Sequence, residues 1–164
     1  MTGITRWRTP NQAPVAAWRP RRSASVLDRR FGPDDLAGLR AAIIAYAASL
    51  VGTDAAGRDA ADEILLVAHE LATNAVKHGG GRGRLCLSAA EGRVWCVVSD
   101  NGPGLRDPHL AGATLPARNK PGGRGLWVVR QMSDLTIATT TAGTTVTAAI
   151  PRRPGTAGRL LNRR

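Results

Sequence analysis

Residues 69–78 read His-Glu-Leu-Ala-Thr-Asn-Ala-Val-Lys-His, and their polar and apolar residues follow a helical spacing. Glu70 and Asn74 are four residues apart, so at about 100° per residue they lie almost above one another on a helix, and Lys77 continues this polar stripe. An apolar stripe runs beside it, formed by Ile64, Ala68, Leu71 and Ala75. The polar stripe can therefore line the edge of a binding site.

Periodicity on both sides of this helix predicts the remaining elements. Apolar residues at spacings of three and four indicate helices over about 33–52, 59–79 and 124–132. Alternating apolar and polar residues indicate strands over 23–31, 84–89, 93–99, 135–140 and 144–150. This order predicts an α+β fold, a two-layer sandwich in which about three helices cover one face of a mostly antiparallel sheet.

Length and composition predict one domain with basic flanks. A chain of 164 residues, 43% of them apolar, can bury one core but leaves little room for a second. We expect a domain over 23–151, a flexible basic lead-in over 1–22 and a basic disordered tail over 152–164. Because the sequence lacks a signal-peptide-like apolar core and a membrane-spanning run, we expect a soluble cytoplasmic protein without a membrane partner.

The formal net charge of +11 is carried almost wholly by arginine. Such a charge raises nucleic acids, membrane surfaces and acidic proteins as partners, and it does not choose among them. No aromatic-rich platform or recognition-helix motif accompanies the charge, so direct nucleic-acid binding is not expected.

The two cysteines, Cys86 and Cys96, stand in neighbouring predicted strands. They have neither the CxxC spacing nor the His/Cys cluster that is typical of a metal or redox site. We interpret both as small buried apolar residues.

A second group of candidate binding residues follows the predicted strand 93–99, where the sequence reads Asp100-Asn101-Gly102-Pro103-Gly104. A carboxylate at a strand end can accept a hydrogen bond from an exocyclic amine such as that of adenine, and two glycines let the backbone approach a flat ligand. Taken alone, the same residues also suit an ordinary turn.

Two further glycine motifs lie later in the chain. Gly122-Gly123-Arg124-Gly125 precedes an apolar helix, and free N–H groups at a helix start attract anions. This stretch is neither a Walker A loop nor a G-x-G-x-x-G fingerprint after a strand. Gly143-Thr144 stands between the last two predicted strands and suits a plain hairpin turn.

In this order, E-x-x-x-N, D-x-G-x-G, G-x-G-L before a helix and G-T in the last hairpin resemble the N, G1, G2 and terminal boxes of the Bergerat-fold (GHKL) ATPase family. The resemblance covers roughly residues 23–151. Residues 69–78 and 123–134 are most similar to the helices of the RsbW/SpoIIAB anti-sigma factor kinases.

The resemblance implies a role for each motif residue toward MgATP. Glu70 would be the general base, Asn74 the Mg²⁺ ligand and Lys77 a phosphate contact. Asp100 would bind the adenine amino group, with Thr144 contacting the adenine site indirectly. The other implied binding residues and segments are Gly102 and Gly104, which shape the base pocket, the ATP lid at 105–121, Gly123 and Gly125 at its hinge, Leu126 of the G-x-G-L box, and a basic lid residue among Arg118, Lys120 and Arg124.

The implied function is that of an anti-sigma factor serine/threonine protein kinase acting in partner switching. It would bind a sigma factor, phosphorylate an anti-anti-sigma protein of the STAS type and form a homodimer through the first strand and helix. Two alternatives stay open: an ATP-responsive binding module without kinase activity, and a basic nucleic-acid-binding protein. His69, His78 and His109 are poor candidates for a phosphoacceptor histidine.

Overall fold

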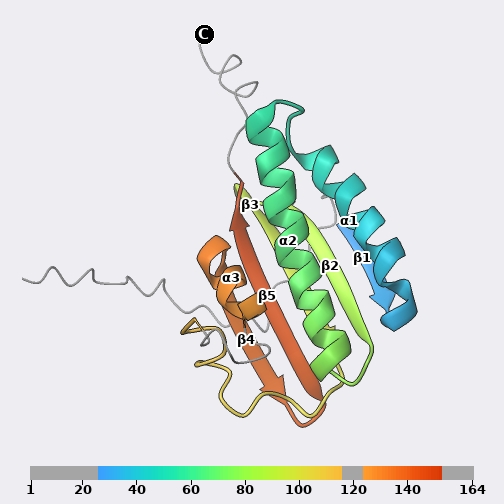
Figure 1. The fold of residues 1–164 in the computed structure, drawn as a ribbon, viewed down its shortest axis with the longest axis vertical. Coiled ribbons are helices and arrows are strands. Elements are labelled where there is room, and N and C mark those ends of the chain that lie inside the picture. Colours follow the sequence, from blue (N-terminus) through green and yellow to red (C-terminus); the bar gives the residue numbers. More distant parts are fainter. Residues whose placement is uncertain (1–25, 116–123, 153–164) are drawn as a thin grey trace, which may run out of the picture.

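Five strands and three α-helices build the computed structural model over the residues that it describes, 26–115 and 124–152 (Figure 1). In chain order the elements are β1 (Val26–Phe31), a 3₁₀ turn η2 (Pro33–Asp35), α1 (Leu36–Leu50), α2 (Ala55–His78), β2 (Gly83–Ala90), β3 (Arg93–Asp100), α3 (Arg124–Met132), β4 (Asp134–Thr140) and β5 (Gly143–Pro151). The sheet has the order β1-β2-β3-β5-β4, and each neighbouring pair is antiparallel. The three helices lie on one face of it, so the predicted fold class is confirmed.

The core lies between the helices and the sheet face that they cover. Leu27, Leu87, Cys96 and Ala148 are paired in register across four strands, and all are buried. Because directly paired residues share a face of the sheet, this row points toward the helices. It packs in one cluster with helix residues that include Ile43, Ile64 and Val129.

The register places the two cysteines on opposite faces. Cys86 pairs with Val97, whereas Cys96 pairs with Leu87 on the adjacent row. Cys96 is fully buried, but Cys86 is only half-buried on the helix-free face, so the prediction that both are buried is wrong for Cys86. Burial raises the pKa of each thiol. A disulfide between the two is excluded because their side chains leave the sheet in opposite directions.

The start of α2 differs from the prediction. The helix begins at Ala55 rather than at residue 59, because Asp54 caps it by accepting a hydrogen bond from the N–H of Gly57 at 2.8 Å. A Cβ on Gly57 would lie 1.8 Å from the carbonyl oxygen of Gly52. Gly57 is therefore required by the close approach of Gly52, which precedes the helix.

The first predicted helix also begins later than expected. Its first residues form η2, in which Asp35 accepts a hydrogen bond from the N–H of Gly32 at 2.8 Å, and α1 follows from Leu36. The predicted lead-in over 1–22, the tail from residue 153 and the lid from 116 to 121 lie outside the described residues. Within the described ranges, no helix combines the length and apolarity that crossing a membrane requires.

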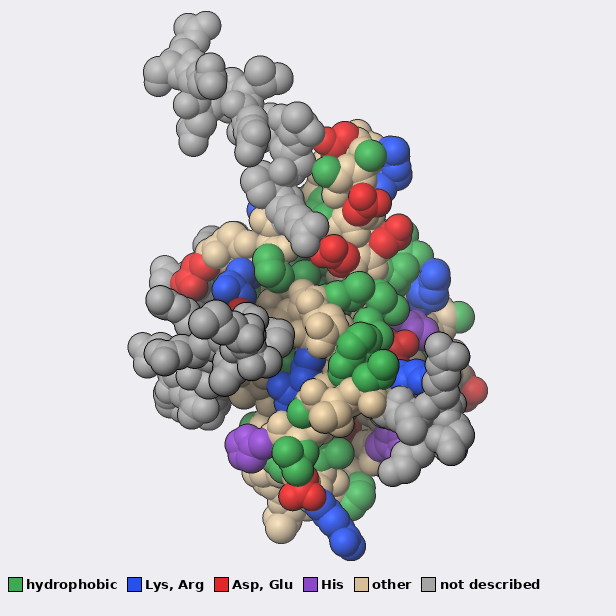
Figure 2. Space-filling view, turned by 60° about the vertical axis from the view of Figure 1, so that its left-hand side comes forward, with side chains coloured by type: hydrophobic (Ala, Val, Ile, Leu, Met, Phe, Trp, Pro, Cys, Tyr) green, Lys and Arg blue, Asp and Glu red, His purple; other side chains and the backbone are tan. Residues whose placement is uncertain are grey.

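The described residues together carry no net formal charge. All 12 Asp and Glu residues of the chain lie in the described ranges, where Lys and Arg are equally numerous. The formal charge of +11 therefore comes wholly from residues 1–25, 116–123 and 153–164. On the face shown in Figure 2, acidic side chains gather over the N-terminal half of α2, which carries Asp59, Asp62 and Glu63.

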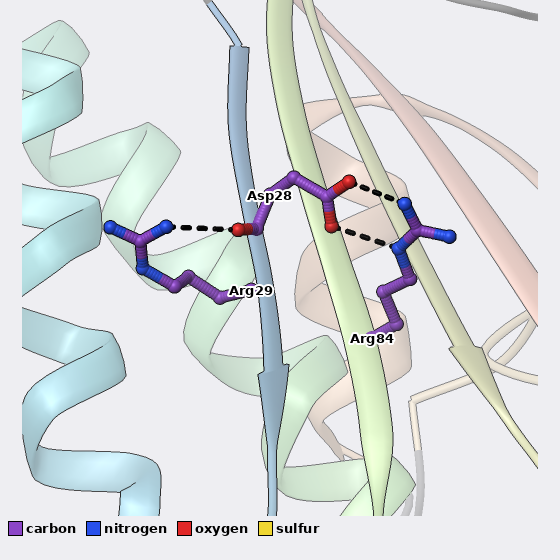
Figure 3. Close-up of polar contacts among 3 residues, drawn as sticks. All are labelled: Asp28, Arg29 and Arg84. Carbon is purple, nitrogen blue, oxygen red and sulfur yellow. Dashed lines mark hydrogen bonds and ion pairs between the residues drawn. The ribbon is translucent and has the colours of Figure 1, made fainter.

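An ion pair joins β1 to β2 on the helix-free face (Figure 3). The Asp28 carboxylate accepts hydrogen bonds from both Nε of Arg84, at 2.8 Å, and Nη2 of the same guanidinium. These bonds lower the pKa of Asp28. A lowered carboxyl pKa adds stability above the ordinary aspartate range, and that stability is lost as the pH falls through the lowered pKa.

We expect Asp28→Asn to lower the free energy of unfolding at neutral pH by about 0.2–1 kcal/mol, since both partners are exposed and solvent screens the pair. Urea denaturation at pH 7 and at a pH below the lowered pKa checks this, and the difference from wild type should vanish at the acidic pH. Asp62→Asn is the matched control, because Asp62 is exposed and forms no ion pair with the described residues. A difference that persists in acid would contradict the account.

Candidate functional site

The carboxylate of Asp100 is held where three elements end or begin. Its Oδ1 accepts a hydrogen bond from the N–H of Gly102 at 3.0 Å and another from the N–H of Thr144 at 3.2 Å. These bonds join the end of β3 to the following turn and to the start of β5. Oδ2 accepts no hydrogen bond from the described residues, so it can receive a donor from a ligand.

Three glycines surround Asp100, and each is required by a close approach. A Cβ on Gly79 would lie 2.3 Å from Cγ of Asp100, and one on Gly102 would lie 2.6 Å from Cα of Gly79. A Cβ on Gly143 would lie 1.9 Å from the carbonyl oxygen of Asp100. The predicted base-pocket residue Gly102 thus lets the chain pass directly beside the end of α2. The sequence placed Gly79 at the end of the predicted helix 59–79 and Gly143 in a hairpin turn, and neither pattern indicated a contact with Asp100.

We expect Gly143→Ala to lower the free energy of unfolding by about 2 kcal/mol, because the new Cβ forces a backbone shift and the residue has φ +141°. The shift would also weaken the bond from Thr144 to Asp100. Gly92→Ala is the control: Gly92 also has positive φ, at +70°, but its Cβ would meet open space. Thermal and urea unfolding of both variants check the prediction, which equal losses in the two would contradict.

Glu70, Asn74 and Gly125 meet where α3 begins. A Cβ on Gly125 would lie 2.2 Å from Oε2 of Glu70 and 3.7 Å from Nδ2 of Asn74. Nδ2 of Asn74 is buried without a hydrogen-bond partner among the described residues, and Glu70 has no hydrogen bond or ion pair within them. Neither side chain is therefore used to hold the fold together, although buried polar groups usually find partners.

This arrangement suits a nucleotide with its metal ion. An asparagine amide oxygen and phosphate oxygens are ligands that Mg²⁺ prefers, and the start of α3 offers N–H groups to an anion. Gly125 keeps the space that a side chain would take from Glu70. The residues present fit MgATP in these respects.

The remaining predicted site residues differ in their exposure to solvent. Lys77 is exposed in the last turn of α2, and Arg124 is exposed at the first position of α3. Leu126 is half-buried and packs against the core. Gly123, like Arg118 and Lys120, lies outside the described residues.

Gly104 has a structural explanation that differs from the predicted one. It has φ +82°, and a Cβ there would lie 2.4 Å from Oγ1 of Thr139. The N–H of Leu105 donates to the same hydroxyl at 3.2 Å. Thr139 on β4 thus anchors the start of the loop, a contact for which the sequence carried no signal.

One hollow of about 700 Å³ lies at the ends of β1, β2 and β3, and its lining includes Arg30, Arg82 and Asp100. Neither Glu70 nor Asn74 lines it. The hollow therefore shares Asp100 with the predicted site and lacks its Glu70 and Asn74.

An antiparallel sheet under three helices, with polar residues at the ends of α2 and β3 and at the start of α3, defines the GHKL class of ATP-binding folds. The profile of the histidine kinase-like ATPase domain family matches residues 32–150. The chain therefore belongs to this family, and ATP binding is the activity that membership supports.

Two solved structures are similar in fold to this chain, at low sequence identity. The histidine kinase domain of the blue-light activated histidine kinase from Erythrobacter litoralis EL346 is 22% identical, with a TM-score of 0.47; the alignment covers 71% of this chain and 63% of that domain. The histidine kinase domain of the E. coli osmosensor EnvZ is 18% identical, with a TM-score of 0.40, over 58% of this chain and 67% of that one. No curated protein is significantly similar.

Proposed function

We propose that this chain is a MgATP-dependent serine/threonine protein kinase that acts as an anti-sigma factor in partner switching. Its substrate would be an anti-anti-sigma protein of the STAS type, and its second partner a sigma factor. The observation that carries the proposal is that Glu70 and Asn74 meet at Gly125. Among the described residues, Nδ2 of Asn74 has no hydrogen-bond partner and Glu70 forms no hydrogen bond or ion pair.

Each residue group has a distinct task in this proposal. Asp100 would select adenine through Oδ2, since Oδ1 is already held by two N–H groups. Asn74 would hold Mg²⁺, which neutralises phosphate charge when bound. Glu70 would accept the proton of the acceptor hydroxyl. Lys77 and Arg124, both exposed, would contact phosphate only from the rim of the site.

The branch assignment within the family rests on the sequence. Residues 69–78 and 123–134 resemble the anti-sigma factor kinases, and a homodimer through β1 and α1 belongs to the same proposal. Ile44 on α1 and Val26 on β1 are exposed apolar residues, which is compatible with such a contact.

A second candidate function is an ATP-responsive binding module without kinase activity, because the same residues would bind ATP in either case. The experiment that separates the two is incubation of the full chain with Mg²⁺, [γ-³²P]ATP and STAS-type proteins of the same genome. Label on a serine or threonine supports the kinase. ATP binding that changes partner affinity without transfer supports the module, and failure to bind ATP overturns both.

A further inference from the structure

The segment that follows the Asp100 turn folds against α3. Within residues 105–115, the N–H groups of Leu110 and Ala111 donate to the carbonyl oxygen of Asp107 at 3.1 and 3.2 Å, and the N–H of Ala113 donates to that of Leu110 at 3.0 Å. These bonds give the segment a compact turn structure of its own. The part of the predicted lid that the structure describes is therefore ordered by local bonds.

Arg130, in the last turn of α3, binds this segment through its backbone. Its Nε donates to the carbonyl oxygen of Ala111 at 2.6 Å, and its Nη2 to that of His109 at 3.4 Å. The side chain is half-buried, and burial lowers the pKa of the guanidinium, which stays charged because its ordinary pKa is so high. Within the described residues no carboxylate pairs with Arg130. Its charge is therefore directed to loop carbonyls, and charged donors make the stronger hydrogen bonds.

Gly112 holds the same segment against the other end of α3. It has φ +69°, and a Cβ there would lie 2.6 Å from both the carbonyl carbon and the oxygen of Leu126. Leu126 is next to Gly125, which contacts Glu70. One turn of chain thus contacts α3 at its first turn through Gly112 and at its last turn through Arg130.

We propose that Arg130 and Gly112 form a clamp that fixes residues 107–113 on α3 and thereby positions Gly125 against Glu70 and Asn74 for nucleotide binding. Arg130 is a positioning residue, because its Nε and Nη2 groups donate hydrogen bonds to the loop and not to the ligand. The positioning role rests on the proposed ATP function. The clamp itself stands on contacts within the protein.

The test compares Arg130→Met, which keeps the length of the side chain without its donors, with the wild-type full chain. Two readouts are needed: amide hydrogen exchange over 107–113 without nucleotide, and the Kd for MgATP by calorimetry. We expect exchange there to accelerate about tenfold and ATP to bind about tenfold more weakly, the size expected for loss of one charge-assisted hydrogen bond. Arg130→Lys, which keeps the charge and can reach one carbonyl, should recover part of both changes.

Gln131→Ala is the matched control, because Gln131 is the exposed neighbour of Arg130 and makes no hydrogen bond to the described part of the loop. Gly112→Ala tests the other end of the clamp and should reproduce both changes even if Arg130→Met folds poorly. Unchanged exchange over 107–113 in both variants overturns the clamp. Faster exchange with unchanged ATP affinity overturns the positioning role. Failure of wild type to bind ATP removes the proposed function and the positioning role together, while the exchange readout still decides on the clamp.

Discussion

Asp100→Asn should weaken ATP binding about 100-fold and remove the preference for ATP over GTP, since hydrogen bonds to charged groups contribute most to such affinity. The N–H groups of Gly102 and Thr144 hold one oxygen of this side chain, so the asparagine oxygen must stay there. Its amide nitrogen then takes the place of Oδ2. A donor would face the adenine amine, which is also a donor, whereas guanine presents an oxo group that can accept.

Calorimetric titration with ATP and with GTP, both with Mg²⁺, measures this change, and thermal unfolding verifies that the variant is folded. The fold should persist because both structural hydrogen bonds to Oδ1 are kept. Asp59→Asn is the control, since Asp59 is exposed near the start of α2, whereas Asp100 lies beside Gly79 at the other end of that helix. Unchanged ATP affinity in a folded Asp100→Asn protein would place the base elsewhere.

Glu70→Gln should reduce the rate of phosphoryl transfer by about 100-fold to 10,000-fold, the range typical of losing a general base. The substitution keeps the shape that fills the space over Gly125, and it removes the group that can accept a proton. ATP affinity should change little, because the proposed role of Glu70 is to accept a proton from the acceptor hydroxyl and not to bind ATP. The substitution should also leave the site folded, since Glu70 makes no hydrogen bond or ion pair within the described residues.

Single-turnover transfer from [γ-³²P]ATP to the acceptor protein measures the loss, with the Kd for ATP determined in parallel. Glu63→Gln serves as the control, because Glu63 is a half-buried glutamate on the same helix. A Glu70→Gln protein that transfers phosphate at the wild-type rate would assign the base to another residue.

Much of the fold could be predicted because periodic segments are local. Strands were predicted over 84–89 and 93–99, and the hairpin of β2 and β3 turns between them at Glu91 and Gly92, both with positive φ. The start of α2 could not be found in this way, because Gly57 inside a helix has the appearance of a helix breaker. Only the folded chain brings Gly52 against it and shows why a glycine is needed.

In the candidate site, too, contacts within one helix could be predicted from the sequence, and contacts between distant segments could not. Glu70 and Asn74 share a helix face, so their spacing alone placed them together, and Gly125 proved to lie beside both. The hydrogen bonds from Arg130 to residues 109 and 111 join segments that no periodicity relates. The same is true of Thr139 and Leu105, where an ordinary strand hydroxyl becomes an anchor only after the sheet has formed.

The neutrality of the described sandwich has a consequence for how the protein meets other molecules. A body with balanced charge exerts little attraction beyond a Debye length of about 10 Å in dilute salt, whereas concentrated arginines do. If the proposed function holds, encounter with an acidic partner would therefore be accelerated by the arginines of residues 1–25, 116–123 and 153–164, and it would slow as ionic strength rises. Nine of these eleven positive charges lie in residues 1–25 and 153–164, apart in sequence from Glu70, Asn74 and Asp100. Under the proposed function, substitutions in these flanks would change the rate of encounter and leave the three site residues as they are.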